Sequence, residues 1–516
     1  MTAQSDIAAG YASEGAAIEL GAVLVDGTVE PTARVRLPLA TLNRHGLVAG
    51  ATGTGKTKTL QLIAEQLSAA GVPVVMADVK GDLSGLSRPG EGGERVTERA
   101  TQTGDDWQPQ ACPVQFLSLG TGGAAVPVRA TVTSFGPILL SKVLGLNDTQ
   151  ESTLGLIFHW ADSRGLPLLD IKDLRSVIGH LTSDEGKADL KGLGGVSSAT
   201  AGVILRSLVN LEAQGGDTFF GEPELDPRDL MRLVDGRGVV SLLELAELQA
   251  RPALFSTFLM WLLAELFEVL PEEGDLDKPK LVFFFDEAHL VFADASKAFL
   301  ERITQTVKLI RSKGVGVFFC TQLPTDVPNA VLSQLGARVQ HALRAFTPED
   351  QAALAKTVKT YPTTPHYELD EALTSLGIGE AVVTVLSEKG APTPVAWTRL
   401  RAPRSLMDTI GSDAITQAAE TSELHAKYAE TVDRESAYEK LAAKVAPPPA
   451  PEEAAPPPAR EEAPPREPER RAEREEPGVV SQVLGNSAVK SFLRSAASAL
   501  GREITRGLFG TSRKRR

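Results

Sequence analysis

Residues Gly50-Ala51-Thr52-Gly53-Thr54-Gly55-Lys56-Thr57 decide the fold. They match the pattern G-x-x-x-x-G-K-[ST] at every fixed position. The apolar segment 46–49 precedes them, and residues 56–70 have the pattern of a helix. Glycines let the backbone turn tightly so that consecutive N–H groups face one anion, and the helix N-terminus adds its positive end. The sequence therefore predicts a strand, a phosphate-binding loop and a helix.

The side chains of this loop indicate that the anion is a nucleoside triphosphate. Lys56 would bring a positive charge to the β- and γ-phosphates, and the Thr57 hydroxyl would bind Mg²⁺. We therefore expect ATP and Mg²⁺ as cofactors. The predicted nucleotide-binding residues are Gly50, Ala51, Thr52, Gly53, Thr54, Gly55, Lys56, Thr57 and Lys58.

A second segment, Leu281-Val-Phe-Phe-Phe followed by Asp286 and Glu287, reads as a buried strand that ends in two acids. Ligands of open α/β sheets bind at the carboxyl ends of the strands. Asp286 is the predicted metal ligand together with Thr57, and Glu287 would polarise the attacking water. Paired acids also begin many helices, so the prediction depends on the acids and the glycine loop together.

Three further residues complete the predicted catalytic set with Lys56 and Glu287. Gln322 ends the apolar strand that begins at Val315, and it would contact the γ-phosphate; an ordinary turn before Pro324 is the alternative. Arg311 and Arg344 are candidates for stabilising charge in the transition state, because P-loop ATPases often use an arginine from a neighbouring subunit. The alternative for each arginine is a helix C-terminal cation or a surface charge.

Strands that alternate with helices from residue 41 onward predict an α/β fold with a parallel sheet. Asp26-Gly27 predicts a hairpin before it. The expected domains are a short N-terminal β region at 1–40, a first core part at 41–129, a helical insertion at 130–235 and a second core part at 236–445.

The last 71 residues, from 446 to 516, differ in composition from the rest of the chain. Residues 446–477 are rich in Pro, Glu and Arg, which predicts a disordered linker. Residues 478–516 predict a basic amphipathic helix with an apolar stripe from Val489 to Leu508. We expect this tail to dock on the chain's own acidic core; nucleic acid, an anionic membrane surface or solvent are the alternatives.

The net charge of −13 in 516 residues argues against a surface built mainly to coat nucleic acid, although a basic channel inside a ring is compatible with it. Both cysteines, Cys112 and Cys320, lie in apolar segments, as buried thiols of a reducing compartment do. The start of the chain lacks a signal-peptide pattern. The apolar segment 253–270 contains Glu265 and Glu268, which favours a buried helix over a membrane span. We expect a cytoplasmic protein without a transmembrane segment.

Four segments together resemble the HerA–FtsK superfamily, and more narrowly the bacterial HerA-like ATPases of the YjgR type. They are 43–57, Met76-Ala-Asp-Val-Lys-Gly-Asp82, Asp286-Glu-Ala-His289 and Arg311-Ser-Lys-Gly-Val. The resemblance covers about residues 15–445 and extends to the style of the C-terminal tail. It implies a RecA-like core that is usually a hexameric ring and that pumps DNA in the better-known members. It maps Lys56 and Thr57 on the Walker A pair, Asp286 and Glu287 on the Walker B pair, and Gln322 on the sensor position.

Two features set the chain apart within this resemblance. The N-terminal β region is too short for the full barrel of archaeal HerA helicases, and the helical insertion has no counterpart whose function carries over. His45 matches a histidine often found before the loop.

The first hypothesis for the function is a DNA translocase or helicase-like motor, which the resemblance favours. The second is an ATP-driven assembly or regulatory switch without nucleic acid, which the net charge favours. Phosphoryl transfer is a third, for which the sequence supplies no acceptor site.

Overall fold

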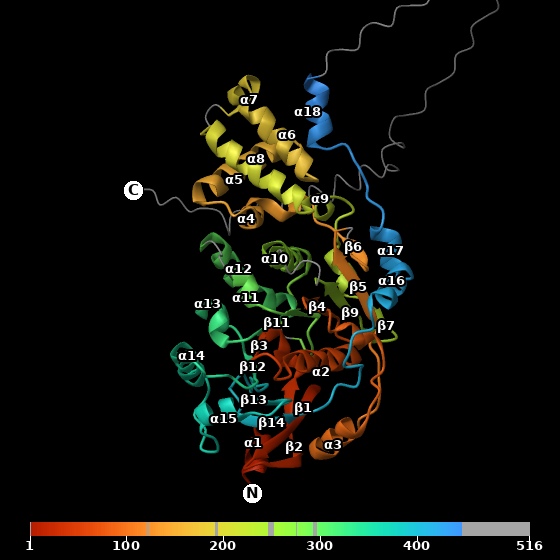
Figure 1. Ribbon diagram of the computed structural model, residues 1–516, viewed down its shortest axis with the longest axis vertical. Coiled ribbons are helices and arrows are strands. Elements are labelled where there is room, and N and C mark those ends of the chain that lie inside the picture. The colour runs from red at the N-terminus through yellow and green to blue at the C-terminus, as the bar shows by residue number, and fades with distance from the viewer. Residues whose placement is uncertain are drawn as a thin grey trace, which may run out of the picture. The chain divides into compact units, whose positions relative to one another are not determined.

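One twelve-stranded sheet organises the chain, in the order β2-β1-β14-β13-β12-β3-β11-β10-β4-β9-β5-β6 (Figure 1). From β12 to β6 every neighbouring pair is parallel, whereas β13, β14, β1 and β2 pair antiparallel. The strands are β1 (Ala17–Val25), β2 (Thr28–Pro38), β3 (Gly46–Ala49), β4 (Val74–Asp78), β5 (Val114–Leu119), β6 (Val126–Val128), β9 (Val240–Glu244), β10 (Leu281–Phe285), β11 (Val315–Thr321), β12 (Ala337–Gln340), β13 (Glu380–Thr384) and β14 (Ala396–Leu400). The predicted α/β fold with a parallel sheet is confirmed.

This computed structural model describes residues 2–120, 123–190, 194–245, 252–274, 276–292 and 297–445. Residues 1–445 form one compact unit. The predicted linker at 446–477 and the predicted basic tail at 478–516 lie outside the described residues.

Alternation of buried side chains explains why the central strands are strands. In β10, Leu281, Phe283 and Phe285 pack in one core, while Val282 and Phe284 pack in the other. Successive side chains of a strand point to opposite faces, and a parallel strand covered on both faces is apolar throughout. The sheet therefore separates two hydrophobic cores.

Helices cover both faces of the sheet. Leu60, Ile63 and Leu67 of α2 (Lys56–Ala69) contribute to the core on one face, and α10 (Pro252–Val269) and α12 (Lys297–Ile310) contribute to the core on the other. The remaining helices are α1 (Ala3–Ala9), α3 (Glu94–Thr103), α4 (Val132–Leu144), α5 (Asp148–Ser163), α6 (Ile171–Thr182), α7 (Asp184–Asp189), α8 (Ser198–Ala213), α9 (Gly216–Phe219), α11 (His289–Phe292), α13 (Asn329–Leu332), α14 (Pro348–Val358), α15 (Leu369–Ser375), α16 (Ser412–Glu420), α17 (Glu423–Tyr428) and α18 (Ala437–Val445).

The N-terminal hairpin forms where the sequence predicts it. Asp26 and Gly27 have φ values of 50° and 72°, as a two-residue turn of type I′ requires, and Val25 pairs with Thr28. Strand β1 also pairs with β14, so the hairpin extends the main sheet.

Between β6 and β9 the chain is mostly helical, from α4 to α9. Helix α18 returns from the end of the described chain to lie beside α6 (Figure 1), where the Tyr438 N–H donates to Asp173 Oδ1 at 2.8 Å. Among the helices that the structure describes, none has the length and apolar character needed to cross a membrane.

Candidate nucleotide-binding site

The loop between β3 and α2 needs glycine at defined points. Gly53 and Gly55 have φ values of 81° and 109°, in the left-handed region that favours glycine. A Cβ added to Gly50 would come within 2.5 Å of the His341 Cβ. The loop therefore has the tight, Cβ-free backbone that lets N–H groups converge on an anion.

Lys56 lies at the start of α2 and is buried. Its Nζ donates to the carbonyls of Gly50 at 2.7 Å and Ala51 at 3.2 Å, so the ammonium group is held against the loop. Thr57 follows on the same first turn and is half-buried. The hydroxyl and carboxylate oxygens of Thr57 and Asp286 are donors of the kind that Mg²⁺ prefers.

Sheet order brings the predicted acids and Gln322 to the same edge as the loop. Strand β11 lies between β3 and β10, with Thr321 opposite Ala49 and Phe319 opposite Phe285. Because these strands are parallel, their carboxyl ends share one edge. Asp286 and Glu287 follow β10 there, and the exposed Gln322 follows β11.

Glu287 is held in position by two basic side chains. Its Oε1 lies 2.7 Å from Lys80 Nζ, and its Oε2 lies 3.3 Å from His289 Nδ1. Its backbone N–H donates to Asp286 Oδ1 at 2.9 Å. Burial raises the pKa of Asp286, and the charge of Lys80 acts in the opposite direction. Lys80 is therefore a site residue that the sequence prediction did not include.

A turn after β4 presents Lys80 to the acids. The Asp78 carboxylate accepts hydrogen bonds from the backbone N–H groups of Gly81 at 2.7 Å, Asp82 at 3.2 Å and Leu83 at 2.9 Å. Burial raises the pKa of Asp78 to about 6. At the end of the adjacent β9, burial and then the proximity of Asp78 raise the pKa of Glu244 to about 8.

The two candidate arginines lie in different places. Arg344 Nη2 donates to the Thr52 carbonyl at 3.3 Å, so Arg344 lies beside the loop of its own chain. Arg311 lines a hollow of about 640 Å³ that also includes Arg44 and Gly336, which precede β3 and β12. This hollow is at the opposite edge of the sheet, so Arg311 is remote from its own Lys56.

His45 has a structural place in the fold. Its Nε2 lies 2.7 Å from the Val307 carbonyl of α12, and the Val317 N–H donates to its Nδ1 at 3.1 Å. The ring is thus the neutral Nε2–H tautomer, which joins α12 to β11. Burial lowers its pKa to about 4.

The fold and the loop define a P-loop protein of the α/β class. The family model described as Helicase HerA-like C-terminal matches residues 25–516, and the chain belongs to that family. This confirms the HerA-like resemblance of the sequence. No curated protein matches the chain.

Solved structures of the plasmid coupling protein TrwB share the fold. TrwB in complex with a non-hydrolysable ATP analogue has a TM-score of 0.53 and 15% identity, and the match covers 80% of this chain and 96% of that chain. TrwB in complex with ADP and Mg²⁺ has a TM-score of 0.52, 15% identity and the same coverage of both chains. The unbound monoclinic form of the bacterial conjugative coupling protein TrwB gives a TM-score of 0.51, with 15% identity and coverage of 80% and 95%.

Proposed function

We propose that the protein hydrolyses ATP to ADP and phosphate with Mg²⁺. The observation that carries the proposal is the placement of the Lys56 loop and the Asp286–Glu287 pair on one sheet edge, with Glu287 oriented by Lys80. Membership of the HerA-like family and the TrwB complexes with nucleotide support it.

Each residue of the proposed site has a separate role in ATP hydrolysis. The loop N–H groups and Lys56 bind the phosphates, and Thr57 and Asp286 would hold Mg²⁺, which neutralises phosphate charge when bound. Glu287 orients the attacking water and accepts its proton, while Lys80 and His289 fix the direction of its carboxylate. Gln322 would contact the γ-phosphate from the end of β11, and Arg344 would reach the phosphates from the segment after β12, where it lies beside the loop.

The experiment compares three variants for ATP binding and hydrolysis. Glu287→Gln should keep ATP affinity and lose most turnover, because the water loses its carboxylate. Lys56→Ala should lose both. Glu244→Gln is the matched control: it changes another strand-end acid whose pKa of about 8 already keeps it largely protonated at neutral pH, so turnover should persist. Wild-type turnover in Glu287→Gln would contradict the assignment.

We further propose that the ATPase works as a homo-oligomeric ring, most simply a hexamer, that moves DNA. The family resemblance supports this, and so does Arg311, whose place across the sheet suits a neighbour's phosphates better than its own. DNA should stimulate hydrolysis, and the stimulation should fall with salt. If DNA leaves the rate of hydrolysis unchanged at every salt concentration, the alternative function, an ATP-driven assembly or regulatory switch, is favoured. The net charge of −13 also favours that alternative.

The tail enters the proposal through its sequence. Its apolar stripe and basic residues suit docking on the acidic core, and a linker of the kind predicted at 446–477 would keep it at high effective concentration. Deletion of residues 478–516 should then alter assembly or basal turnover without DNA or lipid. Unchanged assembly and turnover would remove this idea. We place the protein in the cytoplasm, in keeping with its two buried free cysteines.

A further inference from the structure

The two ends of a bound nucleotide must lie on opposite sides of the P-loop. The acids follow β10, which β11 separates from β3, whereas β12, β13 and β14 lie on the other side of β3. The γ-phosphate is the end that faces the acids and the attacking water. The nucleoside end therefore extends toward the ends of β13 and β14.

A pocket of about 200 Å³ lies on that side of the loop. Gly55, Lys58 and Thr59 form part of its wall, so the pocket continues directly from the phosphate-binding backbone. Gly379, directly before β13, also lines the pocket and contacts the phosphate-binding loop, because its N–H donates to the Thr54 carbonyl at 3.2 Å. The rest of the lining is mainly apolar and includes Leu62, Val96, Ile378, Leu400, Pro403 and Met407.

One wall of the pocket is fastened by Arg99 of α3. Its Nη1 donates to the carbonyls of Gly379 at 2.9 Å and Leu400 at 3.1 Å, and its Nη2 donates to Ile378 at 3.3 Å. One guanidinium group thus joins α3 to the ends of two strands. The position of Val96, one helical turn earlier, is fixed by the same contacts.

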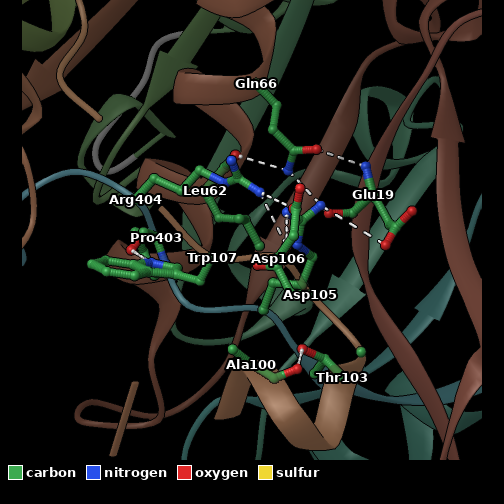
Figure 2. A network of polar contacts seen from close by, with 12 residues as sticks. Glu19, Leu62, Gln66, Ala100, Thr103, Asp105, Asp106, Trp107, Pro403 and Arg404 are labelled. Carbon is green, nitrogen blue, oxygen red and sulfur yellow. Dashed lines mark hydrogen bonds and ion pairs between the residues drawn. The ribbon is translucent and has the colours of Figure 1, made fainter. Parts of the chain in front are cut away.

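Another part of the lining comes from residues 401–408, which we name the strap and of which Arg401, Ala402, Pro403 and Met407 line the pocket. Figure 2 shows how it is held: Trp107 Nε1 donates to the Pro403 carbonyl at 2.8 Å, and Arg404 Nη2 lies 2.6 Å from Asp106 and 3.1 Å from Asp105. The Arg404 N–H donates to the Glu65 carboxylate at 2.9 Å. The pocket is therefore built before any ligand enters.

Lys58 joins the strap to the phosphate-binding helix. Its Nζ donates to the Met407 carbonyl at 2.8 Å. Two of the apolar side chains that line the pocket are exposed to solvent, Ile378 by 75% and Met407 by 38%. Contact with the apolar part of a ligand would cover both.

We propose that this pocket binds the purine base and ribose of the nucleotide whose phosphates lie on the Gly50–Thr57 loop. The proposal rests on the proposed function and assigns the nucleoside end of that same site. An apolar slot with a few polar groups matches a flat heteroaromatic base, and the guanidinium groups of Arg95 and Arg99 supply planar cations that stack on such rings. Lys58 is placed to meet the ribose or the α-phosphate.

The test separates the nucleoside from the phosphates. Met407→Trp fills the pocket from its exposed rim and should weaken ATP binding about ten-fold or more, while inorganic tripolyphosphate binds with unchanged affinity. Val432→Trp is the matched control: Val432 is 50% exposed, on the same C-terminal segment but beside Glu222, and this variant should bind both ligands as wild type does. Unchanged ATP affinity in Met407→Trp, or equal loss of both ligands, would overturn the proposal.

A second measurement uses the unaltered protein. Photolabelling with 8-azido-ATP should mark peptides that contain Val96, Ile378 or Met407, and excess ATP should prevent it. Label confined to other peptides would also overturn the proposal. If wild type binds neither ATP nor tripolyphosphate, the proposed ATPase itself fails, and this inference with it; if wild type binds both and Met407→Trp is unaffected, only the nucleoside pocket is wrong.

Discussion

Glu287 has a φ of 48°, a left-handed conformation that side chains other than glycine rarely adopt. A residue keeps such a conformation when its surroundings fix it. Here the Asp286 carboxylate accepts its N–H, and Lys80 and His289 bracket its side chain. The direction of the carboxylate is thus set by contacts from β4 and β10 together.

Lys80→Met should therefore lower kcat by about ten- to a hundred-fold, because Glu287 loses the partner that orients it. ATP affinity should change little, since Lys80 contacts the acid and not the loop. Stopped-flow binding and steady-state turnover measure the two effects. Lys172→Met, which removes a lysine of α6 that pairs with Glu439 of α18, is the control with wild-type kcat. A Lys80→Met enzyme that turns over normally would show that Glu287 needs no positioning lysine.

His45 gives a prediction about stability and pH. Its pKa is about 4 in the folded protein, below the usual value of 6.5, because burial disfavours the charged ring. Between these values the unfolded chain takes up a proton that the folded chain does not, so His45 lowers the free energy of unfolding as pH falls. His45→Asn should be destabilised at pH 7, through the lost contacts to Val307 and Val317. Chemical unfolding should show the gap to wild type narrowing by about 2 kcal/mol at pH 5. A gap that stays constant would mean that His45 titrates normally.

Local patterns were enough to predict the loop and the acids, because spacing along one strand or turn defines both. The sequence does not predict a role for Lys80, although Lys80 lies in one of the segments that carry the family resemblance. Its role depends on the turn around Asp78, which carries it from the end of β4 to the end of β10. The spacing of residues along the chain does not indicate that Lys80, after β4, meets an acid that follows β10.

At the scale of elements, the sequence predicts those with a continuous apolar pattern and misses those without one. The segments at β3, β10 and β11 are almost entirely apolar, and the sequence predicts all three as strands. It does not predict helix α3, because among the residues of that helix only Val96 and Thr103 are buried. The strap has no regular periodicity, and its position depends on side chains of α2 and of the segment after α3.

Removal of Arg404 should free the strap. Arg404→Ala deletes the ion pairs to Asp105 and Asp106, while Asp105 keeps its partner Arg401. The charged hydrogen bond to the buried Asp105 contributes about 1.5–3 kcal/mol, so amide exchange in residues 401–408 should accelerate about ten-fold or more. Mass-spectrometric hydrogen exchange would measure it, with α6 as the internal reference. Arg434→Ala, which removes the ion pair to Glu222 farther along the chain, should leave the strap protected. Equal exchange in Arg404→Ala and wild type would mean that Glu65 and Trp107 suffice.

At the scale of the whole molecule, an acidic chain carries a local basic surface. The hollow around Arg311 also contains Arg44, Lys308 and Arg338, and no carboxylate is among its described lining residues. The total charge could not predict this surface, because its four basic side chains come from three segments of the chain that meet only in the folded protein: Arg44 before β3, Lys308 in the last turn of α12 with Arg311 directly after it, and Arg338 in β12. A surface of this kind suits an anion supplied from outside the subunit.

Mixing two inactive variants tests whether that anion is a neighbour's nucleotide. Arg311→Ala keeps its loop, and Lys56→Ala keeps its arginine, so neither should hydrolyse ATP alone. In a mixed ring, a Lys56→Ala subunit can offer Arg311 to the intact loop of an Arg311→Ala neighbour. Random mixing at equal amounts creates such an interface at about one contact in four, so about a quarter of wild-type turnover should return. Arg344→Ala is the internal comparison, because Arg344 lies beside the loop of its own chain and its mixture with Lys56→Ala should stay inactive. No recovery in the Arg311 mixture, with rings confirmed by light scattering, would place the function of Arg311 within one subunit or outside catalysis.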